Sequence, residues 1–181
     1  MKQVYLLTGQ PGTGKTSLIK QAIAGMKGRA GGFYTEEIRS QGIRQGFKLV
    51  TLDGHSAVLA HVYFHSQYRV SRYGVDVESL DRVGVSALDQ AARECDLVVI
   101  DEIGKMELCS AKFREVVSHL IRGEKRLLGT IMLGPDPYAD AVKRQPQVNL
   151  ITVTRANHHQ VMEELRKWLE AIGREEGEEG K

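Results

Sequence analysis

The 181-residue chain lacks several features that would assign it to a specialised class of protein. It has only two cysteines, Cys95 and Cys109, and no C-x-x-C pair, which argues against a disulfide framework and indicates two reduced thiols. No hydrophobic run approaches the length of a membrane span, and no signal-peptide pattern opens the chain. We therefore expect a soluble, cytoplasmic protein with no membrane partner.

A strong excess of one charge is also missing. Lys and Arg total 25 against 23 Asp and Glu, which leaves a net charge of +2, and no block of basic residues occurs. This balance does not indicate a nucleic-acid partner. The length allows one well-buried domain, expected as a monomer. Residues 173–181 carry four Glu with one Arg and one Lys, a composition that predicts a disordered polar tail.

The most informative feature that is present is the segment Gly9–Thr16, GQPGTGKT, which fills every fixed position of G-x-x-x-x-G-K-[ST]. It follows an apolar run and precedes a segment with helical spacing. In that context the loop N–H groups and the helix dipole attract phosphate oxygens. Lys15 would reach the β- and γ-phosphates, and Thr16 would hold Mg²⁺. A glycine-rich turn that caps a helix is the plainer alternative, but the pattern predicts a nucleoside triphosphate site.

A second motif predicts what happens to the triphosphate. Four apolar residues, 97–100, precede Asp101 and Glu102, as in a strand that ends in acids. Asp101 would orient water on the Mg²⁺ held by Thr16, so these two residues form the predicted metal site. Glu102 would polarise a water for in-line attack on the γ-phosphate. Together with Lys15, which would contact that phosphate, Glu102 is a predicted catalytic residue. The alternative for Glu102 is a local ion pair with Lys105.

Other polar residues are less specific. Thr130 interrupts an apolar strand expected beside that of Asp101, where it would contact the γ-phosphate or the attacking water, or bond within its own sheet. The pair His61 and His65 has no supporting Cys or acid cluster, so we expect no zinc site there. Trp168 lies at helical spacing with apolar residues and is expected in the core. Five arginines are candidates for stabilising the transition state: Arg39, Arg44, Arg69, Arg72 and Arg155.

Hydrophobic periodicity predicts alternating strands and helices. The expected strands are 4–7, 33–38, 47–52, 57–60, 97–100, 127–132 and 148–153, and the expected helices are 16–26, 77–94, 110–121, 138–144 and 157–172. Such alternation predicts a single α/β domain over 1–172, with a mainly parallel central sheet and helices on both faces. The glycine-rich region 31–75 is expected to form antiparallel β-hairpins inserted into that pattern.

Five segments carry a resemblance to a known family: GQPGTGKTSL, GGFYTEEIRSQGIRQGFKLVTLDG, YGVDVE, LVVIDEIGKMEL, and the late pieces GTI and TVTRAN. On these segments the chain resembles the P-loop nucleoside triphosphatases first described from thermophilic microbes, whose animal relatives are called cancer-related nucleoside triphosphatases. The resemblance implies a RecA-like P-loop domain. It also implies slow, Mg²⁺-dependent hydrolysis of ATP, GTP, CTP and UTP with little base preference.

The resemblance also implies a set of nucleotide contacts. One difference from the family pattern is His158, where Arg is favoured after the Asn, and Arg155 is a possible replacement. The implied nucleotide-binding residues are Gly9, Gln10, Pro11, Gly12, Thr13, Gly14, Lys15, Thr16, Ser17, Val98, Val99, Ile100, Asp101, Glu102, Ile103, Gly104 and Lys105.

Hydrolysis is the leading hypothesis, and two alternatives stay open. The first is a nucleotide, nucleoside or polynucleotide 5′-kinase, in which the arginine-bearing region 31–75 closes over a second substrate. The second is a switch module whose nucleotide state is recognised by a partner. A motor that acts on nucleic acid is least favoured, because the chain has one nucleotide motif and no basic track.

Overall fold

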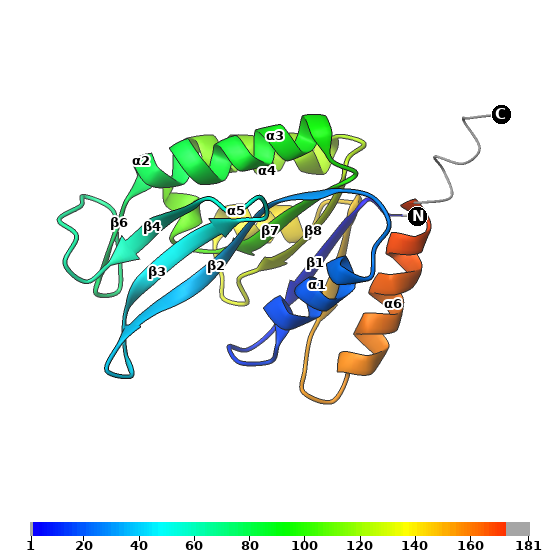
Figure 1. The fold of residues 1–181 in the computed structure, drawn as a ribbon, viewed down its shortest axis with the longest axis horizontal. Coiled ribbons are helices and arrows are strands. Elements are labelled where there is room, and N and C mark those ends of the chain that lie inside the picture. Colours follow the sequence, from blue (N-terminus) through cyan, green and yellow to red (C-terminus); the bar gives the residue numbers. More distant parts are fainter. Residues whose placement is uncertain (1, 173–181) are drawn as a thin grey trace.

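The computed structural model describes residues 2–172, so the predicted disordered tail at 173–181 lies outside the described residues. Its centre is a nine-stranded sheet in the order β5-β6-β4-β3-β2-β7-β8-β1-β9. Helices cover both faces of the parallel half of this sheet (Figure 1). The predicted α/β class with a mainly parallel central sheet is therefore confirmed.

The parallel half contains β2, β7, β8, β1 and β9, and every neighbouring pair among them is parallel. Their registers bring the carboxyl ends of β1, β7 and β8 to one edge of the sheet, which is where ligands bind in open α/β folds. These strands and their connecting helices are β1 (Val4–Thr8), α1 (Lys15–Ala24), β2 (Ala30–Ser40), β7 (Leu97–Ile103), α4 (Ala111–Arg122), β8 (Arg126–Ile131), α5 (Pro137–Lys143), β9 (Val148–Thr152) and α6 (His158–Glu170).

The predicted hairpin region is antiparallel, as expected. Its strands are β2, β3 (Ile43–Thr51), β4 (Ser56–His61), β5 (Arg69–Val70) and β6 (Tyr73–Val75). Strand β2 is antiparallel to β3 and parallel to β7. The hairpins therefore continue the central sheet, and β2 belongs to both halves. The limits of the predicted domain, 1–172, and of its insertion, 31–75, stay a prediction.

The helical segment predicted over 77–94 has three parts. These are α2 (Val77–Ser79), the π-helical segment η1 (Leu80–Val85) and α3 (Ser86–Glu94). Gly84 lies in η1, and a Cβ atom there would lie 3.0 Å from Leu80 Cδ1 and 3.4 Å from Phe33 Cε1. The missing side chain therefore lets η1 pack closely on β2.

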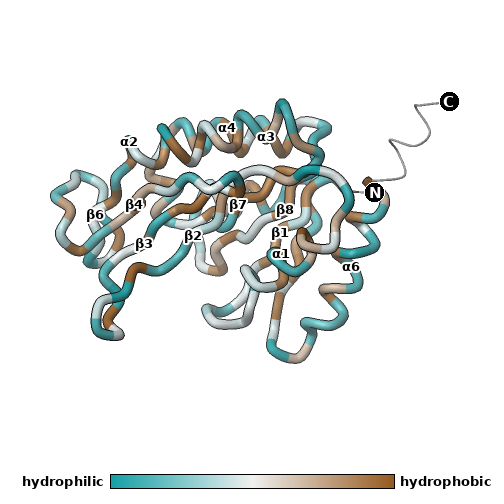
Figure 2. The backbone as a smooth tube through the Cα atoms, in the orientation of Figure 1, coloured by the Kyte–Doolittle hydropathy of each residue, from teal (hydrophilic) through white to brown (hydrophobic). Residues whose placement is uncertain are grey.

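Two apolar cores lie on the two faces of the sheet because strand side chains alternate. In β1, Val4 and Leu6 belong to the core under α3 and α4, whereas Tyr5 and Leu7 belong to the core under α1 and α6. Trp168 of α6 is buried, as predicted, and its ring stacks on Tyr5 with centroids 4.3 Å apart. Figure 2 shows apolar residues gathered on the central strands and polar residues on the outer surfaces of the helices.

Ser110 and the two cysteines complete the description of the fold. Ser110 caps α4, since its hydroxyl accepts a hydrogen bond from the N–H of Phe113 at 3.0 Å. Cys95 and Cys109 are both free thiols. Within residues 2–172, none of the helices combines the length and apolar character that a membrane crossing requires.

Candidate active site

The phosphate loop joins the end of β1 to the start of α1. Gly12 and Gly14 have φ angles of 77° and 82°, in the left-handed region that glycine adopts without strain. Gly9 has a φ of 146°, and a Cβ there would lie 2.5 Å from the carbonyl oxygen of Val153. The loop therefore favours glycine at all three positions, and the motif itself specifies Gly9 and Gly14.

Lys15 begins α1 and folds its side chain back over the loop. Its ammonium Nζ donates to the carbonyl oxygens of Gly9 and Gln10, each at 3.0 Å. The positive charge is therefore held at the concave side of the loop, where the N–H groups of a phosphate loop converge. Ser17 follows in the first turn of α1 and is exposed.

The two predicted metal ligands lie in direct contact. Thr16 Oγ1 donates to Asp101 Oδ2 at 2.5 Å, across 85 residues of sequence. Thr130 Oγ1 donates to the other oxygen, Asp101 Oδ1, at 2.6 Å. Thr130 lies on β8, beside the strand of Asp101 as predicted, and it orients that carboxylate. Asp101 is thus held between one hydroxyl from α1 and one from β8.

The Glu102 side chain lies against Gly104. A Cβ atom placed on Gly104 would lie 2.5 Å from Glu102 Oε1, so the Glu102 side chain packs directly against that glycine. The positive charge of Lys15 acts on both Glu102 and Asp101. Throughout the described part of the chain Glu102 has no ion pair within 4.0 Å, so the predicted alternative partner, Lys105, does not hold it in this structure.

Burial determines the acidity of both carboxyl groups. It raises the pKa of Asp101, and the hydroxyls of Thr130 and Thr16 and the charge of Lys15 oppose that rise. It also raises the pKa of Glu102, and the charge of Asp101 adds to the effect. A raised pKa makes a carboxylate a stronger proton acceptor, as a general base requires.

Sequence reasoning missed a third acid, Glu107, which lies in the short 3₁₀ segment η2 (Glu107–Cys109). Glu107 is only 3% exposed, and burial together with the charges of Glu102 and Asp101 raises its pKa to about 8. Thr35 Oγ1 lies 3.5 Å from Glu107 Oε1 and 2.7 Å from the carbonyl oxygen of Asp101. A Glu between the apolar residues Met106 and Leu108 was the available signal.

Tyr34 is another residue that the sequence did not single out. It lies opposite Asp101 in the β2–β7 register. Burial and the charge of Asp101 raise its pKa to about 12, so the phenol keeps its proton at neutral pH. The ammonium of Lys20, on α1, lies 4.9 Å from the centre of the Tyr34 ring and also pairs with Glu36. Strand β2 therefore forms one wall beside the phosphate loop.

His158 contacts the outer side of the loop. Its Nε2 lies within hydrogen-bonding reach of the carbonyl oxygen of Thr13, and a Cβ on Gly14 would lie 2.8 Å from the His158 ring. A pocket of about 270 Å³ lies here between α1 and α6. Arg155, named as a possible replacement for the family's Arg, is exposed in the loop before α6.

The four arginines of the hairpin region make local contacts. Arg39 and Arg44 both bond to Glu37, and Arg44 also donates to the hydroxyl of Tyr73. Arg69 donates to the carbonyl oxygens of Phe64 and Arg72. Arg72 donates to the carbonyl oxygen of Arg44 and to the hydroxyl of Tyr73. A role for any of these arginines in the transition state stays a prediction.

The remaining residues of the second predicted segment support the acids. Val98, Val99, Ile100 and Ile103 have no exposed surface and pack into the two cores. Their side chains fix β7 in the sheet, and Lys105 at the end of the segment is exposed. Direct nucleotide contacts by these residues stay a prediction.

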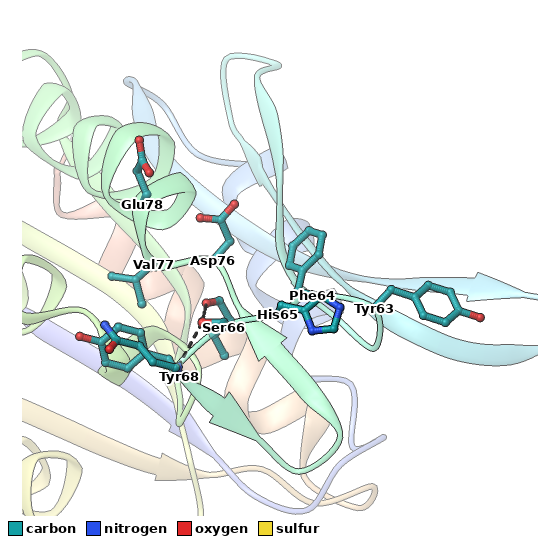
Figure 3. A pocket seen from close by; sticks show the side chains of 10 residues that line it. Tyr63, Phe64, His65, Ser66, Tyr68, Asp76, Val77 and Glu78 are labelled. Atoms are coloured by element: carbon teal, nitrogen blue, oxygen red, sulfur yellow. Dashed lines mark hydrogen bonds between the residues drawn. The ribbon is translucent and has the colours of Figure 1, made fainter.

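A separate hollow lies at the other end of the sheet. It has a volume of about 430 Å³ and is lined by residues of the β4–β5 connection and by Asp76 and Glu78 (Figure 3). In the strand order β4, β3, β2, β7 and β8 separate β6 from β1. None of the predicted site residues lines this hollow, so it is not part of the site described here.

The residues present fit a magnesium ion. Mg²⁺ prefers oxygen ligands, and it binds through one or two protein groups together with substrate phosphates and water. The Thr16 hydroxyl and the Asp101 carboxylate supply two adjacent oxygen donors beside the phosphate loop. Within residues 2–172 no group of three or more His, Cys, Asp or Glu side chains could hold a metal by itself, so the substrate would complete the site.

Comparison with known proteins assigns this arrangement to a family. A family model described as NTPase matches residues 4–166. The chain belongs to this NTPase family. The resemblance found in the sequence motifs is thereby confirmed.

Two curated relatives bear the name nucleoside-triphosphatase THEP1. The protein from Thermotoga sp. (strain RQ2) is 44% identical over 160 residues, which cover 88% of this chain and 91% of the relative. The protein from Aquifex aeolicus (strain VF5) is 34% identical over 174 residues, which cover 91% of this chain and 98% of the relative.

Solved structures agree with the fold. The crystal structure of THEP1 from the hyperthermophile Aquifex aeolicus matches with a TM-score of 0.84 and 34% identity, over 92% of this chain and 99% of that one. The solution structure of a human cancer-related nucleoside triphosphatase matches with a TM-score of 0.76 and 32% identity, over 94% and 98%. The P-loop NTPase fold is therefore shown.

The packing of Glu102 on Gly104 yields a first prediction. In Gly104→Ala the new methyl group would lie 2.5 Å from Glu102 Oε1, so the flexible Glu102 side chain must move. We expect the rate of phosphate release from a nucleoside triphosphate to fall about 10- to 100-fold, because small displacements of reacting groups are costly. Nucleotide affinity should stay unchanged in a fluorescence titration. Gly25→Ala, whose Cβ has no neighbour closer than 3.9 Å, is the matched control. A fully active Gly104→Ala would contradict the packing argument.

The buried Glu107 yields a prediction about stability. Its pKa of about 8 in the folded chain exceeds the ordinary value of 4.5, so the folded state binds more protons than the unfolded state between these values. Stability therefore falls as pH rises through this window. Glu107→Gln removes the ionisation, and the melting temperature of this variant minus that of the unmodified protein should increase from pH 5 to pH 8. A difference that stays constant with pH would show that Glu107 ionises normally.

Proposed function

We propose that the chain is an Mg²⁺-dependent nucleoside triphosphatase that releases the γ-phosphate as inorganic phosphate. The observation that carries this proposal is the 2.5 Å contact between Thr16 and Asp101. It joins the phosphate loop to the acidic end of β7, so the predicted metal ligands share one position. Membership of the NTPase family and the name nucleoside-triphosphatase of the relatives support the same activity.

Each side chain of the site has a role in this proposal. The loop N–H groups and Lys15 bind the β- and γ-phosphates and offset their negative charge. Thr16 and Asp101 would hold Mg²⁺, and the ion would supply positive charge beside the phosphate oxygens. Thr130 fixes the Asp101 carboxylate in place.

Glu102 is the proposed catalytic carboxylate. It orients a water molecule for in-line attack on the γ-phosphorus and accepts a proton as the new P–O bond forms. The bond from the γ-phosphorus to the bridging oxygen breaks, and the products are the diphosphate and inorganic phosphate. The raised pKa of Glu102, caused first by burial, supports its assignment as a proton acceptor.

The kinase alternative receives less support. A kinase that transfers phosphate to an alcohol must exclude water, and it gains from arginines that reach the transferred group. Arg39 and Arg44 are instead bonded to Glu37. Arg69 and Arg72 are bonded to carbonyl oxygens and to the Tyr73 hydroxyl of their own region. The partly buried Glu102, on which the charge of Lys15 acts, favours activation of water.

The proposal extends to substrates and setting. ATP, GTP, CTP and UTP all serve as substrates, since the contacts that support the activity involve the phosphates, which these nucleotides share. Turnover is slow and the chain acts as a monomer in the cytoplasm, without nucleic acid. The two free, partly buried thiols are consistent with a reducing compartment.

Glu102→Gln tests the proposed catalytic role. The amide keeps the shape of the side chain but cannot accept the proton, so we expect phosphate release to fall by about 10²- to 10⁴-fold. The dissociation constant for a fluorescent nucleotide analogue should change little. Glu115→Gln, on the exposed side of α4, is the matched control. Hydrolysis by Glu102→Gln at the unmodified rate would refute the role of Glu102.

The substrate class and the metal can be tested together. We expect phosphate release from all four nucleoside triphosphates without any added acceptor, at rates within about tenfold of each other, because a site that binds mainly phosphate discriminates bases weakly. Chelation of Mg²⁺ should abolish release, and added Mg²⁺ should restore it. Transfer of labelled phosphate to a nucleoside or a 5′-hydroxyl end, far faster than hydrolysis, would favour the kinase alternative.

A further inference from the structure

The peptide group between Asp101 and Glu102 lies where the regular sheet ladder is interrupted. In the β7–β8 register, Ile100 pairs with Gly129 and the next pair is Ile103 with Ile131. The two acids between them therefore have no Cα partner on β8 in the described register. On the other side, the β2–β7 register ends at the pair Tyr34 and Asp101. The peptide that follows Asp101 therefore lies at the last Cα pair of β7 with β2 and inside the interruption of its pairing with β8.

A side chain holds this peptide group by a hydrogen bond. Thr35 Oγ1 donates to the carbonyl oxygen of Asp101 at 2.7 Å. That oxygen belongs to the peptide group that joins Asp101 to Glu102. The orientation of this group sets the direction in which the Glu102 side chain leaves the strand, so Thr35 acts on the position of Glu102 without touching it.

Glu107 in turn acts on Thr35. A threonine hydroxyl has one hydrogen, and the carbonyl oxygen of Asp101 can only accept, so that hydrogen belongs to the 2.7 Å bond. The Thr35 oxygen then presents lone pairs to Glu107 Oε1, 3.5 Å away. If Glu107 were ionised, its lone pairs would face those of the Thr35 oxygen and the two would repel. A neutral Glu107 can instead donate its carboxylic hydrogen to the Thr35 oxygen. Burial and the charges of Glu102 and Asp101 favour the neutral form, and they outweigh the main-chain hydrogen bonds from Glu107 and Gly104, which favour the ionised form.

We propose that Thr35 and a neutral, hydrogen-donating Glu107 are positioning residues that fix the Asp101–Glu102 peptide and thereby the carboxylate that activates water. The chain of contacts runs from Glu107 to Thr35, then to the Asp101 carbonyl and the Glu102 side chain. In this chain of contacts Glu107 donates to Thr35, and Thr35 donates to the Asp101 carbonyl. Burial raises the pKa of Glu107, which agrees with its role as a donor. This inference rests on the proposed hydrolytic role of Glu102.

The test uses pairs of variants that differ only in the proposed bond. Thr35→Val removes the hydroxyl at nearly constant shape, and Thr35→Ser retains it. Glu107→Met removes the donor, and Glu107→Gln supplies a neutral amide donor. Thr152→Val, an exposed threonine on β9, is the control for the loss of a hydroxyl in a strand. Melting temperatures identify folded variants, and Thr35→Val keeps the test intact if Glu107→Met does not fold.

We expect Thr35→Val and Glu107→Met to lower kcat about 10- to 100-fold, because the catalytic carboxylate is displaced. The dissociation constant for a fluorescent nucleotide should change less than about threefold, since the phosphate loop is unaltered. Thr35→Ser and Glu107→Gln should recover most of the lost turnover. A loss of nucleotide affinity that matches the loss of kcat, or no recovery in the conservative variants, would overturn the proposal.

A double-variant cycle separates positioning from a general structural effect. If Thr35 acts through Glu102, Thr35→Val should cause little further loss in a Glu102→Gln background, measured in single-turnover reactions with excess enzyme. An equal loss in both backgrounds would contradict the proposed route. A fully active Thr35→Val beside an inactive Glu102→Gln would refute this inference and leave the proposed function intact. A fully active Glu102→Gln would instead refute the proposed function itself.

Discussion

The contact between Thr16 and Asp101 is the interaction on which the site depends. Thr16 belongs to the first turn of α1, and Asp101 lies 85 residues later, at the carboxyl end of β7. Strand β8 lies between β1 and β7 in the sheet, and its Thr130 donates to the same carboxylate. The Asp101 carboxylate on β7 therefore connects the residues that follow the phosphate loop to strand β8. Because of this connection, Asp101 and the adjacent Glu102 lie at the same edge of the sheet as the phosphate loop.

The same arrangement concentrates negative charge in the interior. Asp101, Glu102 and Glu107 lie close enough for their charges to interact, and burial raises the pKa of each. The hydroxyls of Thr130 and Thr16 and the charge of Lys15 lower the pKa of Asp101 and so partly offset the effect of burial. A neutral Glu107 leaves one negative charge fewer in the cluster. A bound cation would reduce the electrostatic repulsion within such an acidic cluster.

The meeting of the phosphate loop, Asp101 and Thr130 at one edge of the sheet could be predicted because the sequence signals are local. The phosphate loop has a fixed spacing and a strand before it, and the apolar run that precedes Asp101 can only be a buried strand in this setting. Thr130 could be placed beside Asp101 because adjacent parallel strands end at one edge. The same logic applies to Thr35, a polar residue in β2, but the pairing of β2 with β7 was not readable from the chain.

Other features depend on tertiary packing and could not be predicted. Glu107 appears in the sequence as an ordinary acid after a loop, and only the fold buries it near Glu102. The π-helical segment η1 reflects the close approach of Leu80 and Phe33 at Gly84, which helical periodicity does not encode. The hairpin region was predicted as antiparallel, yet its first strand also extends the parallel sheet, because β2 has different partners on its two sides.

The most direct test of the account is the position of a divalent ion in the nucleotide complex. Crystals grown with Mn²⁺ in place of Mg²⁺ and a non-hydrolysable nucleoside triphosphate would reveal the ion by its anomalous scattering. The account predicts a single peak beside the Thr16 hydroxyl and the Asp101 carboxylate, with Glu102 facing the terminal phosphate. A nucleotide bound with its phosphates away from the loop, or an ion bound elsewhere, would contradict the central claim.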